Sequence, residues 1–315
     1  MAELDTRPAT PGDTSAILEL LKASLGESPL LKRKPELWAW KHTANPFGPS
    51  IVLLAWSGDR LAGVRAMMRW ELHTRDGELV RCVRAVDTAT HPEFMRRGIF
   101  RRLTEEAIEI ARDEDVHLVF NTPNPKSAAG YLTMGWTEVG WIGAQIRPRM
   151  GRSVRPDGET PPALESVLPT ARPFEPVDHE NRPARGLRTL RTIEYQTWRF
   201  SGHPRVRYGT VGEHETTAVV RAGVRGGRTE LVLADLLGDP NSRVIREVAR
   251  HSRAAYVGGF FSKGSPERGA AIRAGLLPVP RLHTLRLVAR PLTELDFDVF
   301  DLDSWDIAVS DLELL

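Results

Sequence analysis

The sequence predicts an α/β (α+β) protein built from two tandem domains of one fold. Strand-like apolar runs alternate with segments of helical period along most of the chain, a pattern typical of this fold class. The same order of elements appears once in each half, and a proline-rich stretch separates the two copies. A chain of 315 residues is long enough for two domains, each with a core of its own.

The first copy opens with Trp40, which is followed six residues later by Pro46. Its first helix is amphipathic, because Leu103 and Ala107 recur at helical spacing while glutamates occupy the opposite face. The predicted elements, in order, are strands over 51–56, 61–68 and 79–90, a helix over 103–112, a strand over 116–120 and a proline-initiated helix over 125–135.

The second copy repeats this order, starting from Trp198 and a proline six residues later, Pro204. Each copy also has a strand in which an aspartate, Asp87 or Asp235, stands five residues before a proline. The matching elements are strands over 206–211 and 217–224, the strand of Asp235, a helix over 244–253, a strand over 255–261 and a helix over 266–275. A shared order of this length is hard to obtain by chance, so we interpret it as a tandem duplication.

Composition shifts divide the chain further. Prolines recur with little periodicity between the copies, which predicts a partly extended linker. The end of the chain is acidic but rich in large apolar residues, so we expect it to pack on the folded protein. The predicted divisions are a first domain over 1–146, a linker over 147–186, a second domain over 187–292 and a tail over 293–315.

Charge and composition limit the function classes. The net charge is +2, but no lysine or arginine follows Arg290 and eight acids do, so the rest of the chain carries about +10. That excess suits phosphorylated ligands, and it is too dispersed to predict nucleic-acid binding. No apolar run approaches the length of a membrane span, and no signal peptide is recognisable. The single cysteine excludes an internal disulfide, and together these features lead us to expect a cytoplasmic protein.

A basic turn before the first amphipathic helix is the most informative local feature. The strand over 79–90 leads into a turn at His91, after which four arginines surround Gly98. A strand, a glycine-containing basic turn and a helix N-terminus together form an arrangement that binds pyrophosphate, because free N–H groups, the helix dipole and arginine charges all face the anion. The loop consists of Met95, Arg96, Arg97, Gly98, Ile99, Phe100 and Arg101.

A second segment follows about thirty residues later, with Asn124, Ser127, Tyr131 and Gly135-Trp136 at characteristic spacings. Together the two segments resemble the acyl-CoA-dependent N-acetyltransferases of the GNAT superfamily, over about residues 4–145. The segment from Trp38 to Gly48, the second copy and the chain's ending resemble bacterial, actinobacterial-type proteins of that superfamily with tandem halves.

The loop departs from the family pattern at two positions. Met95 stands where a polar residue is usual, and Phe100 stands where glycine or alanine lets the cofactor pass. The Phe100 ring must therefore point into the core, or the loop must widen.

The resemblance implies that each domain is a mixed, mostly antiparallel sheet flanked by helices. It also implies acetyl-CoA, or another acyl-CoA, as co-substrate and no metal. Tyr131 matches the family's general acid, which protonates the departing thiolate. Backbone groups at the strand end, about 86–90, would bind the pantetheine arm and polarise the thioester. The implied cofactor-binding residues are the loop residues named above together with Thr88, Ala89, Thr90, Asn121, Asn124 and Ser127.

The general base is open. Asp87 is a candidate because it lies in the central strand beside the site. Asp235 occupies the matching place in a copy that lacks both the basic loop and the tyrosine, which favours an architectural role for both acids. A water chain, or an acid such as Asp303 or Asp306, would serve as base instead.

The second copy has Ala271 where the first has Tyr131, and no glycine-arginine turn, so we expect one coenzyme site per chain. We expect an N-acetyltransferase acting on the primary amine of an amino sugar, an amino acid or another small metabolite. Two alternatives remain: a non-catalytic acyl-CoA sensor, and an aminoacyl transferase of the tandem cell-wall type, against which the basic loop argues. We expect no nucleic-acid partner and no membrane-spanning segment, and the sequence leaves the oligomeric state open.

Overall fold

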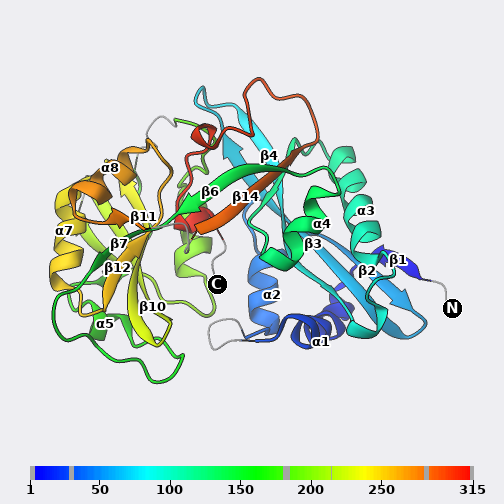
Figure 1. Ribbon diagram of the computed structural model, residues 1–315, viewed down its shortest axis with the longest axis horizontal. Helices are drawn as coiled ribbons and strands as arrows, with labels where there is room; N and C mark the ends of the chain where they lie inside the picture. Colours follow the sequence, from blue (N-terminus) through cyan, green and yellow to red (C-terminus); the bar gives the residue numbers. More distant parts are fainter. Residues whose placement is uncertain (1–3, 28–31, 180–184, 214, 280–283, 313–315) are drawn as a thin grey trace. The chain divides into compact units, whose positions relative to one another are not determined.

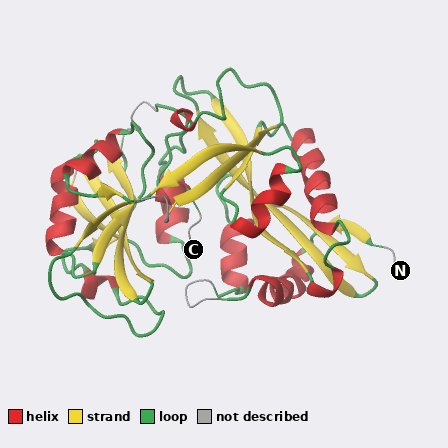
Figure 2. Ribbon diagram, viewed as in Figure 1, coloured by secondary structure: helices red, strands yellow, loops and turns green. Residues whose placement is uncertain are grey.

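The computed structural model describes residues 4–27, 32–179, 185–213, 215–279 and 284–312. The chain divides into two compact units. Unit 1 comprises 1–72, 79–139 and 286–300, and unit 2 comprises 73–78, 140–285 and 301–315. In the described part of the chain, each unit has one mixed sheet of seven strands flanked by helices, which confirms the predicted fold class (Figures 1 and 2).

The sheet of unit 1 has the strand order β1-β2-β3-β4-β5-β14-β6. Its strands are β1 (Asp5–Pro8), β2 (Ile51–Ser57), β3 (Arg60–His73), β4 (Leu79–Thr90), β5 (Leu118–Asn121), β14 (Thr284–Pro291) and β6 (Thr137–Gly143). β1, β2 and β3 are antiparallel neighbours, β4 and β5 are parallel, and β14 is antiparallel to β5. Figure 1 shows β14 beside β6, although 140 residues separate them in sequence.

Helices cover both faces of this sheet. They are α1 (Thr14–Leu25), α2 (Pro35–His42), α3 (Ile99–Asp113) and α4 (Pro125–Leu132). Consecutive strand residues point to opposite faces, so Leu53 and Leu54 of β2 belong to different cores. Leu53 packs with α3 residues such as Leu103, whereas Leu54 packs with α1 residues such as Ile17. The side chains of α3 that face the core are those that the helical period predicts.

Unit 2 repeats the pattern with the strand order β13-β7-β12-β11-β10-β9-β8. Its strands are β7 (Gln145–Pro148), β8 (Arg172–Pro173), β9 (Gly209–Glu213), β10 (Thr216–Arg225), β11 (Arg228–Gly238), β12 (Tyr256–Gly259) and β13 (Leu277–Pro278). Its α-helices are α5 (Leu164–Val167), α6 (Ile193–Gln196), α7 (Ser242–His251) and α8 (Pro266–Arg273). The order β9, β10, β11, α7, β12, α8 matches β2, β3, β4, α3, β5, α4, as the duplication predicts.

Each sheet contains a strand that comes from beyond its own copy of the repeat. β14, near the end of the chain, lies between β5 and β6 in unit 1. The equivalent place in unit 2, next to β12, is taken by β7, which directly follows the first copy. The two copies have thus exchanged one strand, β7 for β14.

Segments outside the repeat also contribute buried side chains to unit 2. Val167 and Leu168 in the proline-rich stretch are completely buried in its core. In the tail, Trp305 and Leu312 are also buried, with exposures of 1% and 0%. The prediction that the tail packs on folded protein is therefore confirmed. Among the described residues, no helix combines the length and the apolar character needed to cross a membrane.

Candidate active site

The last residues of β4 extend beyond its parallel neighbour. β4 pairs with β5 through Cys82–Arg84, opposite Leu118–Phe120, yet β4 continues to Thr90. Asp87 interrupts the strand with a left-handed backbone, φ 38°. The predicted cofactor-binding residues Thr88, Ala89 and Thr90 therefore lie on a stretch of β4 that extends past the end of β5.

A buried guanidinium links this stretch to Tyr131. Arg65, in the middle of β3, is 0% exposed. Its Nη1 donates to the Tyr131 hydroxyl at 2.8 Å and to Thr88 Oγ1 at 2.6 Å. Its Nε and Nη2 are buried and have no hydrogen-bond partner among the described residues. Removing a guanidinium from water costs about several kcal/mol of free energy when its N–H groups are not all paired. The burial of Arg65 beside Tyr131 and Thr88 therefore indicates a functional role for its side chain.

Aromatic packing fixes the tyrosine itself. The Tyr131 side chain is 4% exposed, and its ring packs edge-on against Phe100 and Trp136, with centroids 5.5 Å and 5.1 Å apart. The Phe100 ring therefore points into the core, which is the first of the two arrangements that its position allowed. Gly130 makes room for it, because a Cβ there would lie 3.0 Å from Phe100 Cε1.

The basic loop forms an exposed turn that ends at the start of α3. Gly98 is the N-cap in the left-handed conformation, φ 74°, and Arg96 has φ 62°. Met95 is 61% exposed, so its apolar side chain is not part of the core. The N–H groups of the first turn of α3 have no intrahelical acceptor, as at every helix start.

The four arginines of this turn differ in their contacts. Arg101 bonds Glu105 at 3.1 Å and Arg102 bonds Glu106 at 2.9 Å, so both serve the helix surface. Arg97 lies over the Phe94 ring, 5.0 Å from its centroid. Arg96 and Arg97 form no ion pair with any described residue, which leaves their charge available to an anion at the turn.

Two of the polar side chains predicted to contact the coenzyme, Asn124 and Ser127, form hydrogen bonds at the start of their own helix. Asn124 is the N-cap of α4, and its Oδ1 accepts from the N–H groups of Lys126 and Ser127, both at 3.0 Å. Ser127 Oγ donates to the Asn124 carbonyl at 3.2 Å. Asn121 is different: it is 4% exposed, and its buried Oδ1 has no hydrogen-bond partner among the described residues. Such an oxygen is suited to accept from a ligand N–H.

Asp87 is surrounded by cations rather than poised as a free base. Its carboxylate bonds Lys41 Nζ at 2.8 Å, Arg33 Nη1 at 3.2 Å and His42 Nε2 at 3.1 Å. His42 Nδ1 in turn lies 2.9 Å from Ser50 Oγ. Burial alone would raise the pKa of Asp87, but the Lys41 charge and the His42 hydrogen bond hold that pKa well below its usual range.

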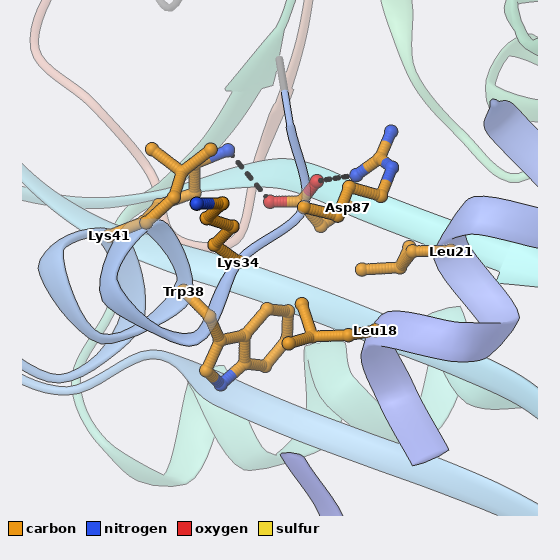
Figure 3. Close-up of a pocket in the computed structure, with 8 residues that line it drawn as sticks. Leu18, Leu21, Lys34, Trp38, Lys41 and Asp87 are labelled. Carbon is orange, nitrogen blue, oxygen red and sulfur yellow. Dashed lines mark hydrogen bonds and ion pairs between the residues drawn. The ribbon is translucent and has the colours of Figure 1, made fainter. Parts of the chain in front are cut away.

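A pocket opens beside this cluster, between α1, α2 and β4. Its lining consists of Leu18, Leu21, Arg33, Lys34, Leu37, Trp38, Lys41 and Asp87. Figure 3 shows the Lys41 and Asp87 side chains joined by an ion pair, with the Trp38 ring and the Leu18 side chain facing one another nearby.

The corresponding acid in unit 2, Asp235, is buried and forms an ion pair. Asp235 is 2% exposed and bonds Arg191 Nε at 2.6 Å, and Arg191 also forms a two-bond pair with Asp311 of the tail, at 2.8 Å for each bond. Ala271 stands buried where unit 1 has Tyr131. α7 begins at the N-cap Asn241, without a glycine-arginine turn.

Sequence reasoning missed the cations of the site. The only sign of Arg65 in the sequence is that a charged residue interrupts the apolar run of β3, a strand that is buried on both faces. Lys41 and His42 end a helix that holds Trp38, and nothing in their spacing indicates that they meet an aspartate more than forty residues later.

Residues 5–139 match the family model described as acetyltransferase (GNAT) domain. None of the curated proteins matches the sequence. Among solved structures, a GCN5-related N-acetyltransferase from Anabaena variabilis ATCC 29413 is 12% identical; the match covers 92% of this chain and 73% of that one, with a TM-score of 0.61. A GCN5-related N-acetyltransferase from Kribbella flavida is 15% identical over 92% of this chain and 71% of that one, with a TM-score of 0.58.

The N-myristoyltransferase of Saccharomyces cerevisiae, solved with bound myristoyl-CoA, is 12% identical over 92% of this chain and 83% of that one, with a TM-score of 0.54. At these identities the likenesses establish the fold, and the family assignment depends on the domain match. The chain therefore carries a GNAT acetyltransferase domain, over residues 5–139.

Proposed function

We propose that the protein transfers an acetyl group from acetyl-CoA to the primary amine of a small molecule, at one site in unit 1. The observation that carries this proposal is the meeting of three features: the end of β4 beyond β5, the basic turn before α3, and the buried Tyr131 held by Arg65. Unit 2 retains the sheet but has neither a basic turn nor a tyrosine at the equivalent places.

The turn and the strand end would hold the coenzyme. N–H groups from Arg96 to Arg101 would bind the pyrophosphate, with the Arg96 and Arg97 charges beside it. The pantetheine arm would run along Thr88, Ala89 and Thr90, and Asn121 Oδ1 would accept an amide N–H from it. A strand N–H directed at the thioester oxygen would stabilise the charge that develops there.

Tyr131 would supply the proton for the leaving group. The amine nitrogen attacks the thioester carbon, the C–S bond breaks, and the thiolate takes the phenol's proton. Since Arg65 donates to the Tyr131 oxygen, the hydroxyl hydrogen is directed elsewhere, toward the departing sulfur. The guanidinium charge also stabilises the phenolate that this transfer leaves, until a proton returns from the amine side by way of solvent.

We propose that Asp87 is not the general base. A carboxylate held by Lys41, Arg33 and His42 resists protonation, and a base must accept a proton. Water at the pocket mouth would remove the amine proton, and Asp87 would keep the surrounding cations in place.

Two measurements on the intact chain test the proposal. Calorimetric titration with acetyl-CoA should show one equivalent bound per chain, and a thiol-release assay over a panel of amines should show turnover with some of them. Binding without release for any amine would favour the acyl-CoA sensor. No binding at all would leave the aminoacyl transferase, or another activity, as the better explanation.

A further inference from the structure

Helix α7 of unit 2 has a strongly basic outer side. Arg243, Arg246 and Arg250 are exposed and recur every three or four residues, so they form one stripe along the helix. The opposite side of α7 carries Ile245 and Val248, which are completely buried in the core of unit 2. The arginine stripe therefore faces away from that core, toward solvent.

Two further segments of unit 2 extend this stripe. Arg246 Nη2 donates to the carbonyl oxygen of Arg273, the last residue of α8, at 3.0 Å, and Figure 1 shows α8 beside α7. Next to the end of α7, Arg149 Nη1 donates to the Ser252 carbonyl and Arg149 Nε to the Arg152 carbonyl, the second at 3.2 Å. We call the resulting surface the basic face. Its exposed arginines are Arg149, Arg152, Arg243, Arg246, Arg250, Arg253 and Arg273, from the segments 147–154, 242–253 and 272–275.

The charge of the basic face is not compensated within the described chain. None of its seven arginines forms an ion pair with a described residue, and the bonds that Arg149 and Arg246 donate go to neutral carbonyl oxygens. In the three segments that supply these arginines, Glu247 is the one acid. Along the sequence the positive charge is dispersed, but the fold brings residues from 149 to 273 onto one surface. A surface of this kind attracts an extended anionic partner.

Large apolar side chains are exposed among these arginines. Met150, between Arg149 and Arg152, is 93% exposed, and Ile272, directly before Arg273, is 40% exposed. Arginines bind phosphate groups at a lipid surface, and exposed apolar side chains enter the boundary between headgroups and acyl chains. None of the three segments contains Phe, Tyr or Trp, the side chains on which the bases of single-stranded nucleic acid stack. This composition therefore favours a lipid surface over a nucleic acid.

We propose that the basic face binds the surface of a membrane that contains anionic phospholipids, so that the protein is a peripheral membrane protein. Arginines close to an anionic leaflet contribute to binding in a roughly additive way, and seven of them outweigh the single glutamate among them. The basic face belongs to unit 2, whereas the proposed coenzyme turn belongs to unit 1, so this inference does not depend on the proposed function.

Co-sedimentation of the full-length protein with lipid vesicles tests the proposal. Vesicles of equal parts phosphatidylglycerol and phosphatidylcholine should bind the protein, and vesicles of phosphatidylcholine alone should not. Raising the salt concentration should weaken the binding, because it screens the attraction between exposed charges. Absence of binding to the anionic vesicles at low salt, or equal binding to both kinds of vesicle, overturns the proposal.

Two matched double variants assign the binding to the basic face. Arg243→Gln/Arg250→Gln should lower the vesicle partition coefficient by about 10- to 30-fold, since each basic residue near an anionic surface contributes about fivefold. Arg96→Gln/Arg97→Gln removes the same charge from exposed arginines of unit 1 and should change the coefficient by less than about twofold. Thermal unfolding checks that both variants are folded. A loss in the second variant as large as in the first would move the contact away from the basic face and overturn the proposal.

Met150 separates a lipid partner from a nucleic acid. Met150→Gln should lower binding to the anionic vesicles by about three- to tenfold, because an apolar side chain is lost from the lipid boundary. Binding to a DNA duplex, measured by fluorescence anisotropy at the same salt and phosphate concentrations, should be weaker than binding to the vesicles. Tighter binding to the duplex, unchanged by Met150→Gln and lost in Arg243→Gln/Arg250→Gln, would replace the membrane by nucleic acid as the partner.

Discussion

Two groups of buried charged side chains in unit 1 make different contacts. Arg65 contacts Tyr131 and Thr88, whereas Arg33, Lys41 and His42 contact Asp87. The family resemblance implied Tyr131 as the general acid, and its place in the central strand beside the site made Asp87 a candidate base. The sequence did not indicate what the cations contact, since a contact between residues 23 to 66 positions apart depends on strand register and helix packing rather than on local pattern.

We predict that Tyr131→Phe keeps the affinity for acetyl-CoA and lowers turnover by roughly 10²–10⁴-fold, the usual contribution of a positioned acid. The loss of the hydroxyl also removes an acceptor from Arg65, so the melting temperature should fall modestly. Calorimetry, thiol release and thermal unfolding measure the three effects. Unchanged turnover would reduce Tyr131 to a packing residue.

Arg65 should act through that tyrosine. Arg65→Met should lower kcat more than it raises KM for acetyl-CoA, because the guanidinium orients the Tyr131 hydroxyl rather than binding the coenzyme. In the Tyr131→Phe background the same change should have little further effect on kcat, as expected for two residues of one unit. Equal effects of Arg65→Met in both backgrounds would show that it contributes only to stability.

Asp87→Asn should destabilise the protein by about 3–5 kcal/mol at neutral pH, since it removes the buried carboxylate that Arg33, Lys41 and His42 contact. The folded-state pKa of Asp87 lies below the unfolded value, so its stabilisation is complete above pH about 4 and disappears as the pH falls further. The difference in unfolding free energy between native and variant protein should therefore be present above pH about 4 and shrink in stronger acid.

Urea unfolding at each pH measures this difference. Asp76→Asn, at an exposed acid, is the control and should change stability by less than about 0.5 kcal/mol. A large loss of turnover in an Asp87→Asn protein with a native melting temperature would instead make Asp87 the base.

At the scale of elements, the turn from Met95 to Gly98 connects the sheet to α3 and carries the proposed anion site. Gly98 has φ 74°, and a Cβ added there would meet no atom within 4 Å. Gly58, in the turn between β2 and β3, has φ 63° and the same open surroundings. Glutamate at either position meets the same backbone strain. Only at Gly98 would its charge oppose a pyrophosphate.

We predict that Gly98→Glu weakens acetyl-CoA binding by at least about tenfold, because each charge-assisted hydrogen bond to an anion contributes about 1.5–3 kcal/mol. Gly58→Glu should leave the dissociation constant unchanged while lowering the melting temperature comparably. Gly98→Ala separates strain from charge. Binding that survives Gly98→Glu in a folded protein would place the coenzyme elsewhere.

Much of each element was readable from the sequence. Asn124-Pro125 and Ser265-Pro266 are N-cap and first-turn residues of α4 and α8, and both dipeptides are recognisable helix starts. The same capping role explains why Asn124 and Ser127 follow a fixed spacing. The element that escaped prediction is the distorted end of β4, where Asp87 adopts a left-handed backbone that its residue type does not announce.

At the scale of the whole molecule, the order of elements was predictable and the pairing of the outer strands was not. β14 is a short apolar strand, and its sequence is compatible with any free sheet edge. Its partner, β5, lies about 170 residues earlier, and no local turn fixes the pairing. The duplication itself suggested that each copy completes its own sheet, whereas β14 and β7 have exchanged places.

The exchange means that unit 1 depends on a segment far from its own copy. Leu287, Val288 and Ala289 of β14 are completely buried, and Val288 belongs to the same core cluster as Tyr131. Arg290 Nη1 donates to the Met134 carbonyl at 2.7 Å, close to the end of α4. Without β14, β5 loses its partner on one side and the tyrosine's helix loses a support.

We therefore predict that a fragment of residues 4–143 does not fold stably, whereas the same fragment joined by a flexible linker to residues 284–300 folds and binds acetyl-CoA. Burial of one leucine and one valine alone stabilises by about 3–6 kcal/mol, a large share of the roughly 5–15 kcal/mol typical of a domain. Circular dichroism, cooperative thermal unfolding and calorimetry compare the two. Val288→Asp in the joined fragment is the control and should abolish folding, because it buries an unpaired carboxylate. If residues 4–143 alone unfold cooperatively and bind acetyl-CoA as tightly as the intact chain does, β14 is a replaceable edge of the sheet and not a part of the catalytic unit.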